Sequence, residues 1–107
     1  MTPVMRNAGS PAAARIRFYR DPDSELPHIY HHEVTQEEVE LALRHRGEDR
    51  VGREGSRVAI GRTHAGRVLR VIYVREADPG AIFVITAYEL RGKALIAFRR
   101  RQRRKPQ

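Results

Sequence analysis

The apolar residues of this chain recur with two different spacings, and these spacings predict where its helices and strands lie. Residues 35–46 carry apolar side chains three and four positions apart, which places them on one face of a helix. Thr35 and Glu38 have the separation of a capping box, in which each side chain accepts a hydrogen bond from the backbone N–H of the other. The sequence therefore predicts a helix from about Thr35 to Arg46, with Gly47 as its C-cap. Its inner stripe consists of Val39, Ala42 and Leu43.

Strands are predicted where apolar and polar residues alternate, or where apolar residues dominate a short segment. Residues 15–19 alternate and predict one short strand. Four later segments, separated by turns that contain glycine, predict a run of strands: 50–53, 57–64, 67–75 and 81–88. The last two are apolar on both faces, which is typical of central strands. Residues 92–104 place Leu95 and Phe98 on one helical side before a basic run, which predicts a C-terminal helix.

The order of these elements predicts an α+β domain with an antiparallel β-sheet meander, one helix in the N-terminal half and a basic helix at the C-terminus. The 107 residues suit one domain with a single core. Residues 1–14 contain small residues and proline without apolar periodicity, so we expect a disordered extension there. We divide the chain into this extension, an α+β domain over residues 15–98 and a basic tail over residues 99–107.

The composition excludes several classes of protein. Without cysteine, the chain has no disulfide framework, no thiolate metal site and no cysteine nucleophile. It contains no apolar run long enough to span a membrane, and its N-terminal residues lack the apolar core of a secretory signal. We therefore expect a cytoplasmic protein without a membrane partner.

Charge is distributed very unevenly along the chain. All 13 acidic residues lie at or before Glu89, and 13 of the 21 basic residues lie before position 90, so residues 1–90 carry no net charge. The net charge of +8 therefore belongs to the last 17 residues. Its cations are Arg91, Lys93, Arg99, Arg100, Arg101, Arg103, Arg104 and Lys105.

A cationic segment of this density attracts polyanions, and each phosphate that it neutralises releases condensed counterions. We expect these residues to bind the phosphates of RNA, either ribosomal or messenger. Other interpretations of the segment are a tail that only keeps the protein in solution and a surface for an acidic protein partner. An anionic membrane surface ranks last, because the segment has no amphipathic stripe with large apolar anchors beyond Phe98.

Four segments of the chain, in order, resemble the BrnT family of toxins, which belongs to the RelE-like ribonuclease fold group and to bacterial type II toxin–antitoxin pairs. The resemblance covers about residues 28–98. Its segments are His31-His32-Glu33-Val34-Thr35, Arg57-Val58-Ala59-Ile60-Gly61-Arg62-Thr63, Gly66-Arg67-Val68-Leu69-Arg70-Val71-Ile72-Tyr73 and Val84-Ile85-Thr86-Ala87-Tyr88. His32, Arg57 and Thr86 match the pattern of the family. Phe83 and Tyr88 stand where the family has arginine.

The resemblance implies RNA cleavage without a metal. Such cleavage needs one group that takes the 2′-hydroxyl proton, one that protonates the leaving oxygen, and cations that stabilise the phosphorane. His32 is the candidate for proton transfer, because it stands where the family has its histidine and an imidazole titrates near neutral pH. Tyr88 is a candidate to orient a base or to act as an acid, and Arg57 is the third catalytic candidate.

Arg57, Arg62 and Arg70 project from adjacent predicted strands, and a shared face would make them a phosphate clamp. Each candidate also has a structural interpretation, in which the histidine and the tyrosine pack and the arginines are ordinary surface charges. The cluster His28-x-x-His31-His32 comes without cysteine or an HExxH pattern, so we predict no metal site and no cofactor.

Two functions are consistent with these features. The first is a toxin-like RNA-binding protein or endoribonuclease of a type II toxin–antitoxin system, with RNA as substrate and a cognate antitoxin as partner. The second is a non-catalytic module that binds nucleic acid or a protein partner through its basic C-terminus. A homodimer is compatible with both.

Overall fold

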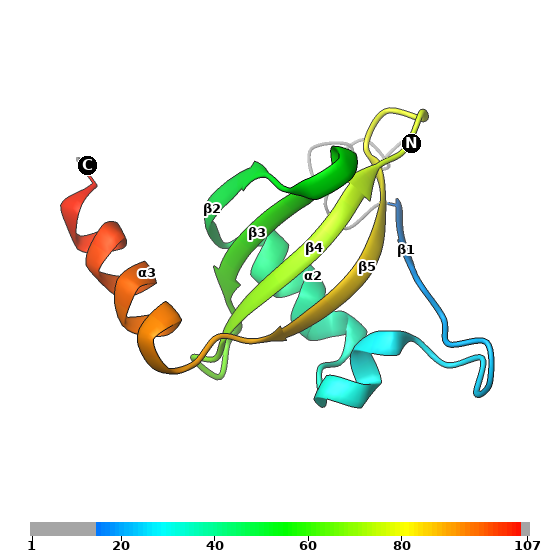
Figure 1. The fold of residues 1–107 in the computed structure, drawn as a ribbon, viewed down its shortest axis with the longest axis horizontal. Coiled ribbons are helices and arrows are strands. Elements are labelled where there is room, and N and C mark those ends of the chain that lie inside the picture. The colour runs from blue at the N-terminus through cyan, green and yellow to red at the C-terminus, as the bar shows by residue number, and fades with distance from the viewer. Residues whose placement is uncertain (1–14, 106–107) are drawn as a thin grey trace, which may run out of the picture.

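The computed structural model describes residues 15–105 and has the α+β architecture that the sequence predicts (Figure 1). Five strands form one mixed sheet in the order β1-β5-β4-β3-β2. Their bounds are β1 Arg15–Phe18, β2 Arg46–Val51, β3 Arg57–Arg62, β4 Val68–Arg75 and β5 Ala81–Glu89. Within residues 15–105 the α-helices are α2 Gln36–Arg44 and α3 Gly92–Arg104, and the short 3-10 helices are η2 His28–His32 and η3 Arg53–Gly55. The extension predicted over residues 1–14 lies outside the described residues, as do residues 106–107 of the predicted tail.

Strands β2 to β5 form the predicted antiparallel meander, and β1 joins it as an edge strand. The sheet is not purely antiparallel, in contrast to the prediction from the sequence. Strand β1 runs parallel to the first half of β5, from Arg15 opposite Ala81 to Phe18 opposite Val84. Alternation of apolar residues marks a strand and its buried face, but it does not specify the neighbour or its direction. Helix η2 also packs against β5, so its histidines lie beside that strand.

The main core lies between α2 and one face of the sheet. Its helix side is the predicted stripe Val39, Ala42 and Leu43, each at most 1% exposed. The sheet side includes Leu69, Val71, Tyr73, Val84 and Ala87. Gly61 of β3 lets the helix come very close, since a Cβ at this position would lie 1.9 Å from the backbone oxygen of Ala42.

Helix α2 has the predicted capping box and ends earlier than predicted. Glu38 N donates to Thr35 Oγ1 at 3.1 Å, and Thr35 N donates to Glu38 Oε1 at 3.0 Å. The helix ends at Arg44, so Gly47 is not its C-cap and belongs to β2. A Cβ at Gly47 would lie 2.6 Å from Gln102 Oε1. This glycine therefore makes room for a side chain of α3 against β2.

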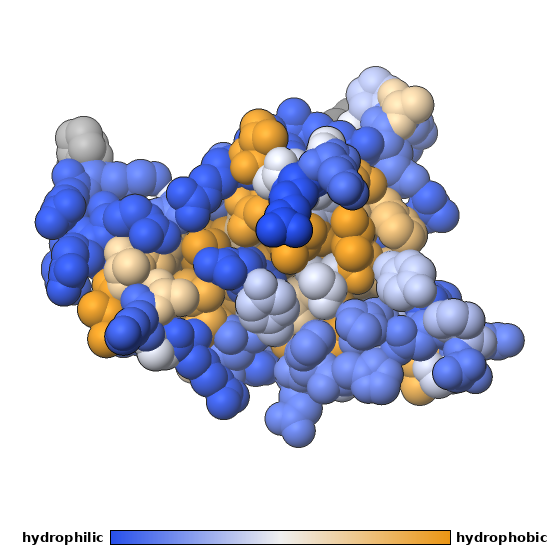
Figure 2. Space-filling view, in the orientation of Figure 1, coloured by the Kyte–Doolittle hydropathy of each residue, from blue (hydrophilic) through white to orange (hydrophobic). Residues whose placement is uncertain are grey.

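The other face of the sheet is only partly covered. Helix α3 packs on one end of it, where the buried Phe98 joins Ile60, Val68 and Leu90 in a second core cluster. We call the rest of this surface the open face; the strand registers place Val58, Arg70, Ile72, Thr86 and Tyr88 on it. Figure 1 views the sheet from this side, with α2 behind it, and Figure 2 shows an apolar patch among hydrophilic side chains.

Candidate nucleic-acid interface

The short helix η2 holds three histidines at the border of the open face. Ile29, 1% exposed, anchors the helix in the core, and Glu33 ends it with a left-handed backbone at φ 60°. His32 stays exposed, and its ring stands at an angle of 60° to the ring of Tyr88, with 5.8 Å between the centroids. The structure therefore brings together two of the three predicted catalytic residues.

Tyr88 connects His32 to Arg70. Arg70 of β4 pairs with Tyr88 of β5, and Arg70 Nη1 donates to the tyrosine hydroxyl at 3.3 Å. The guanidinium carbon lies 5.9 Å from the centroid of the tyrosine ring. Within residues 15–105, the buried Arg70 Nε and the buried Thr86 Oγ1 have no hydrogen-bond partner. Buried polar atoms are normally satisfied, so this part of the open face has hydrogen-bonding capacity that its own residues do not use.

A hollow of about 410 Å³ lies on the open face next to Arg70. The residues around it are Arg50, Gly52, Arg53, Ser56, Val58, Arg70, Ile72 and Tyr88. They combine an apolar surface with three guanidinium groups, which suits a planar base and the phosphates beside it. Arg50 and Arg53 were not among the predicted site residues, because a basic strand followed by a glycine turn has no signature of a binding site.

Helix α3 stands on the same face of the sheet as Arg70. Phe98 packs with Ile60, and the register pairs Ile60 with Arg70. Helical spacing puts Lys93, Arg100 and Arg104 on the side of α3 that points away from Phe98, and all three are exposed. The other exposed cations of this segment are Arg99, Arg103 and Lys105. The helix therefore offers a basic surface to solvent beside the open face.

The basic part of α3 is fixed to strand β2. Arg101 binds Glu48 through two contacts, Nε to Oε2 at 2.5 Å and Nη2 to Oε1 at 3.0 Å. Gln102 Nε2 and Lys105 Nζ donate to the carbonyl oxygen of Gly47 at 3.2 and 2.6 Å. The hydrogen bond from Arg101 holds the pKa of the Glu48 carboxyl below its usual value. Arg101 and Lys105 therefore contribute to docking, whereas the exposed Arg99, Arg100, Arg103 and Arg104 remain available to a ligand.

The structure places Arg57 away from the other two predicted catalytic residues. The register pairs it with Tyr73, a core residue beneath α2, so both lie on the face opposite the open face. Arg57 Nε donates to Asp49 Oδ1 at 2.8 Å, and the Tyr73 hydroxyl donates to Asp49 Oδ2. The hydrogen bond with Asp49 raises the pKa of Arg57, and burial raises the pKa of Tyr73. Arg57 thus joins β2, β3 and β4 in one polar network.

The remaining predicted cations lie near the junction of the sheet with α3. Arg62 ends β3, is exposed, and lies on the same face as Arg70 because it stands two residues after Ile60. Arg91 is 77% exposed and pairs with Glu89 at 3.0 Å. Of the three strand arginines predicted to form a clamp, the register therefore places two on one face and Arg57 on the other.

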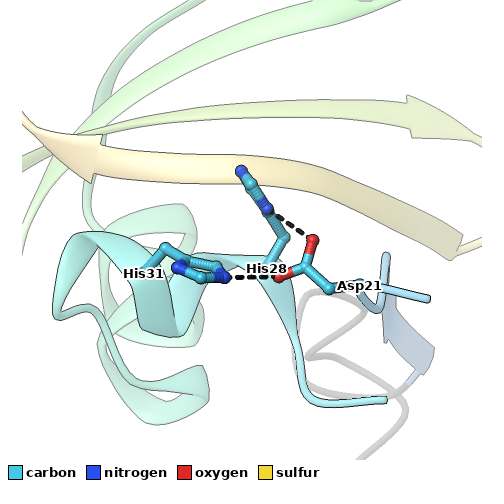
Figure 3. A group of neighbouring side chains, drawn as sticks. All are labelled: Asp21, His28 and His31. Carbon is cyan, nitrogen blue, oxygen red and sulfur yellow. Dashed lines mark hydrogen bonds and ion pairs between the residues drawn. The ribbon is translucent and has the colours of Figure 1, made fainter. Parts of the chain in front are cut away.

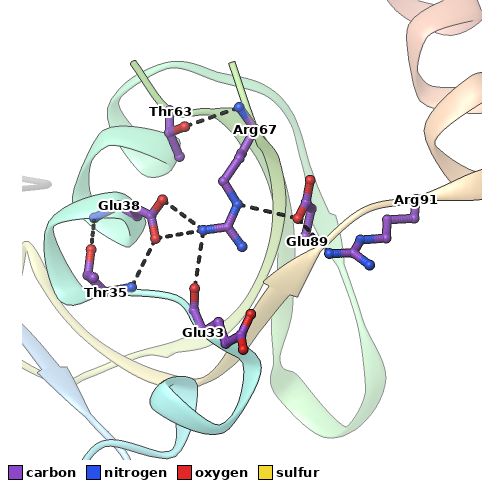
Figure 4. A network of polar contacts seen from close by, with 7 residues as sticks. All are labelled: Glu33, Thr35, Glu38, Thr63, Arg67, Glu89 and Arg91. Atoms are coloured by element: carbon purple, nitrogen blue, oxygen red, sulfur yellow. Dashed lines mark hydrogen bonds and ion pairs between the residues drawn. The ribbon is translucent and has the colours of Figure 1, made fainter. Parts of the chain in front are cut away.

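Arg67, which no sequence motif marks, joins several segments near the interface (Figure 4). Its Nη1 donates to both carboxylate oxygens of Glu38 at 2.9 and 2.8 Å and to the carbonyl oxygen of Glu33 at 3.2 Å. Its Nε donates to Glu89 at 3.4 Å. Glu33 follows His32 and Glu89 follows Tyr88 in the chain, so this network links the two segments that carry those rings.

Comparison with protein-family models, with curated proteins and with solved structures finds no match for this chain. The resemblance to BrnT toxins therefore stays a prediction. Among residues 15–105, no helix combines the length and apolar character needed to cross a membrane.

Proposed function

We propose that this protein binds RNA across the open face of its sheet and along the exposed side of α3. The observation that carries the proposal is the row formed by His32, at the border of the open face, and by Tyr88 and Arg70, on the face where α3 also stands. Aromatic rings stack on unpaired bases, and guanidinium groups bind phosphates. Single-stranded RNA is the preferred ligand, because the bases of an RNA duplex are not available for stacking on protein rings.

Cleavage of the bound RNA is a second proposed activity, favoured by the contact between His32 and Tyr88. In this reaction the imidazole of His32 takes the proton of a ribose 2′-hydroxyl, whose oxygen attacks the adjacent phosphorus. The bond to the 5′-oxygen breaks, and that oxygen receives a proton from the Tyr88 hydroxyl. The products are a 2′,3′-cyclic phosphate and a 5′-hydroxyl. Arg70 stabilises the negative charge of the phosphorane.

An activity of this kind would make the protein a toxin of the cytoplasm, held in check by a cognate antitoxin. Expression of the active protein would then arrest growth, and the substitution His32→Ala would relieve the arrest. The alternative is a module that binds RNA or a protein partner without catalysis. Under that alternative, His32→Ala leaves the growth of the host unchanged.

The binding proposal is tested by the salt dependence of RNA affinity. Each phosphate contact on a single strand contributes about 0.7 to the slope of log affinity against log salt. We expect the variant Arg100→Gln/Arg104→Gln to lower the magnitude of this slope by about 1.4 relative to the wild type. Fluorescence anisotropy of a labelled single-stranded RNA, from about 50 to about 200 mM salt, measures it.

The matched control is Arg44→Gln/Arg75→Gln, which removes the same charge. Arg44 belongs to the helix behind the sheet, and Arg75 ends β4 far from α3. We expect this control to keep the slope of the wild type. An affinity that does not change with salt, or an equal loss in both double variants, would contradict binding through α3.

The cleavage proposal is tested on the same RNA by mass spectrometry of the products. We expect a 2′,3′-cyclic phosphate from the wild type and a rate at least about 100-fold lower from His32→Ala. His64→Ala, which removes another exposed histidine, should cleave at the rate of the wild type. If the folded wild type binds the RNA but leaves it intact, the cleavage proposal is rejected and the binding proposal stands.

A further inference from the structure

A second cluster of side chains lies between the loop after β1 and η2. It adjoins the candidate interface, since the ring centroids of His28 and His32 are 5.4 Å apart. It consists of Asp21, His28 and His31, which point toward one another (Figure 3). His28 Nδ1 lies 2.8 Å from Asp21 Oδ1, and His31 Nε2 lies 2.8 Å from Asp21 Oδ2. The three potential ligand atoms all lie within 4.8 Å of one another. Each carboxylate oxygen therefore faces a different imidazole.

The local backbone explains why these residues meet. His28 and His31 are three residues apart in a 3-10 helix, where such side chains lie directly above one another. The loop before η2 folds back on itself, because Asp21 N donates to the carbonyl oxygen of Leu26 at 2.9 Å and Arg20 forms a bridge with Pro27. Asp21 is thereby held opposite both histidines.

The polar groups of the cluster are not fully satisfied by one another. His28 Nδ1 is within hydrogen-bond geometry of Asp21 Oδ1. The buried Asp21 Oδ2 has no hydrogen-bond partner within the described part of the chain, since His31 Nε2 is near it without the alignment of a hydrogen bond. A carboxylate oxygen that accepts no hydrogen bond and has an imidazole nitrogen beside it is suited to a cation.

We propose that Asp21, His28 and His31 bind one divalent transition-metal ion of the zinc type. Two imidazole nitrogens and one carboxylate oxygen are a ligand set that zinc uses, whereas magnesium and calcium prefer sites made of oxygen. Zinc at about 2.0 to 2.1 Å from each ligand separates tetrahedral ligands by about 3.4 Å. The nitrogen–oxygen pairs between each histidine and Asp21, now at 2.8 Å, reach this spacing by small rotations of the side chains. His31 is free to rotate because its side chain is 65% exposed.

The site leaves room for a ligand that the protein does not supply. Three protein ligands leave one tetrahedral position for water or another small donor. A hollow of about 200 Å³ opens beside the cluster and is lined by Asp21, Ser24, Leu26, Pro27, Tyr30 and His31. The ion would tie the loop to η2, the helix that carries His32. This metal site goes beyond the proposed RNA binding and does not depend on it. It replaces the expectation from the sequence that the histidine cluster holds no metal, because the third ligand, Asp21, joins the histidines only in the folded chain.

Zinc binding is measured on the full chain by calorimetric titration with Zn²⁺ alone. Substitution of Zn²⁺ by Co²⁺ gives a second measurement, because tetrahedral Co²⁺ absorbs strongly in the visible range. We expect a single ion per chain, tetrahedral Co²⁺ absorption, and an unfolding temperature that rises with the concentration of Zn²⁺. His31→Ala and Asp21→Asn should each weaken Zn²⁺ binding by more than about tenfold.

The matched control is His45→Ala/His64→Ala, which removes the two histidines outside η2, whose rings lie 6.2 Å apart. This variant should bind Zn²⁺ like the wild type. Circular dichroism without metal checks that each variant folds, and replacement of the exposed His31 leaves the buried core intact. Three results would overturn the site: no Zn²⁺ binding, binding unchanged in His31→Ala and Asp21→Asn, or an equal loss in the control. Any of them would mean that Asp21, His28 and His31 are a polar cluster without a metal, and the test of RNA binding would stand unchanged.

Discussion

At the scale of single residues, Gly61 sets how closely α2 approaches the sheet. A Cβ at this position would lie 1.9 Å from a backbone oxygen of the helix, which cannot move aside as a flexible side chain can. We expect Gly61→Ala to lower the free energy of unfolding by about 3 kcal/mol, at the upper end of the usual cost of overpacking. Urea denaturation followed by circular dichroism measures this change.

Gly66→Ala is the control that replaces a glycine at a position where the added Cβ meets no neighbouring atom. Gly66 has a φ of 85°, and a Cβ there would have nothing within 4 Å. Its substitution should cost about 1 kcal/mol through backbone strain alone. Equal losses in the two variants would mean that contact with α2 is not what requires glycine at position 61.

Some of these residues were predictable and others were not, for a physical reason. Thr35 and Glu38 interact within one helical turn, so their capping box could be predicted from spacing and is confirmed. Arg67 binds groups from η2, α2 and β5, and Asp21 meets His31 only after a loop has folded back. The contacts of Arg67 and Asp21 join residues that are distant in the sequence or meet only in the folded chain, so the spacing of residues along the sequence does not predict them.

At the scale of elements, the docking of α3 depends on the charge of Glu48. Its pKa is lowered by the hydrogen bond from Arg101, so its contribution to stability is complete above its ordinary pKa of about 4.5 and is lost as the pH falls through the lowered value. We therefore expect the wild type to lose more stability than Glu48→Gln when the pH falls below about 4.5. Urea denaturation at a series of pH values measures the difference between the two proteins.

Other carboxyl groups with lowered pKa values, those of Asp21, Glu76 and Glu89, titrate in both proteins and cancel in this comparison. A pH profile of Glu48→Gln that runs parallel to the wild type would show that the pair with Arg101 does not contribute to stability. The pKa values of the arginines lie too high to affect this range.

The positions of the helices and strands were predicted more reliably than the pairing of the strands. The apolar spacing located α2, α3, β1, β3, β4 and β5 to within a few residues, because burial of one face shapes the local sequence. The strand predicted over residues 50–53 was misplaced: β2 runs Arg46–Val51, and its mostly polar sequence carries no apolar pattern that could have located it. The parallel pairing of β1 and the 3-10 helix η2 were missed. A strand of four residues does not encode its neighbour, and η2 has a single buried residue, Ile29, that could have marked it.

At the scale of the whole molecule, removal of the basic segment should have two separable effects. A chain ended after Phe98 keeps Arg91 and Lys93 but loses the exposed cations from Arg99 onward together with Arg101, so we expect weaker RNA binding and a lower unfolding temperature. A full-length variant with glutamine at the four exposed arginines keeps the docking contacts and should lose RNA affinity alone. These four arginines are Arg99, Arg100, Arg103 and Arg104.

RNA affinity by anisotropy and thermal unfolding by circular dichroism measure the two effects on the same samples. If the full-length variant binds RNA as the wild type does, the cations of α3 do not contact phosphate. If the shortened chain is as stable as the wild type, the contacts of α3 with β2 contribute nothing to stability.

The position of α3 at one end of the molecule also has a kinetic consequence (Figure 1). Because the net charge of the chain resides in its last residues, the molecule is an electric dipole whose positive pole is this helix. A polyanion diffusing toward it experiences a torque that turns the helix forward before contact. Collisions with a polyanion in dilute salt are therefore oriented in advance, with α3 toward the polyanion and the open face of the sheet next to it.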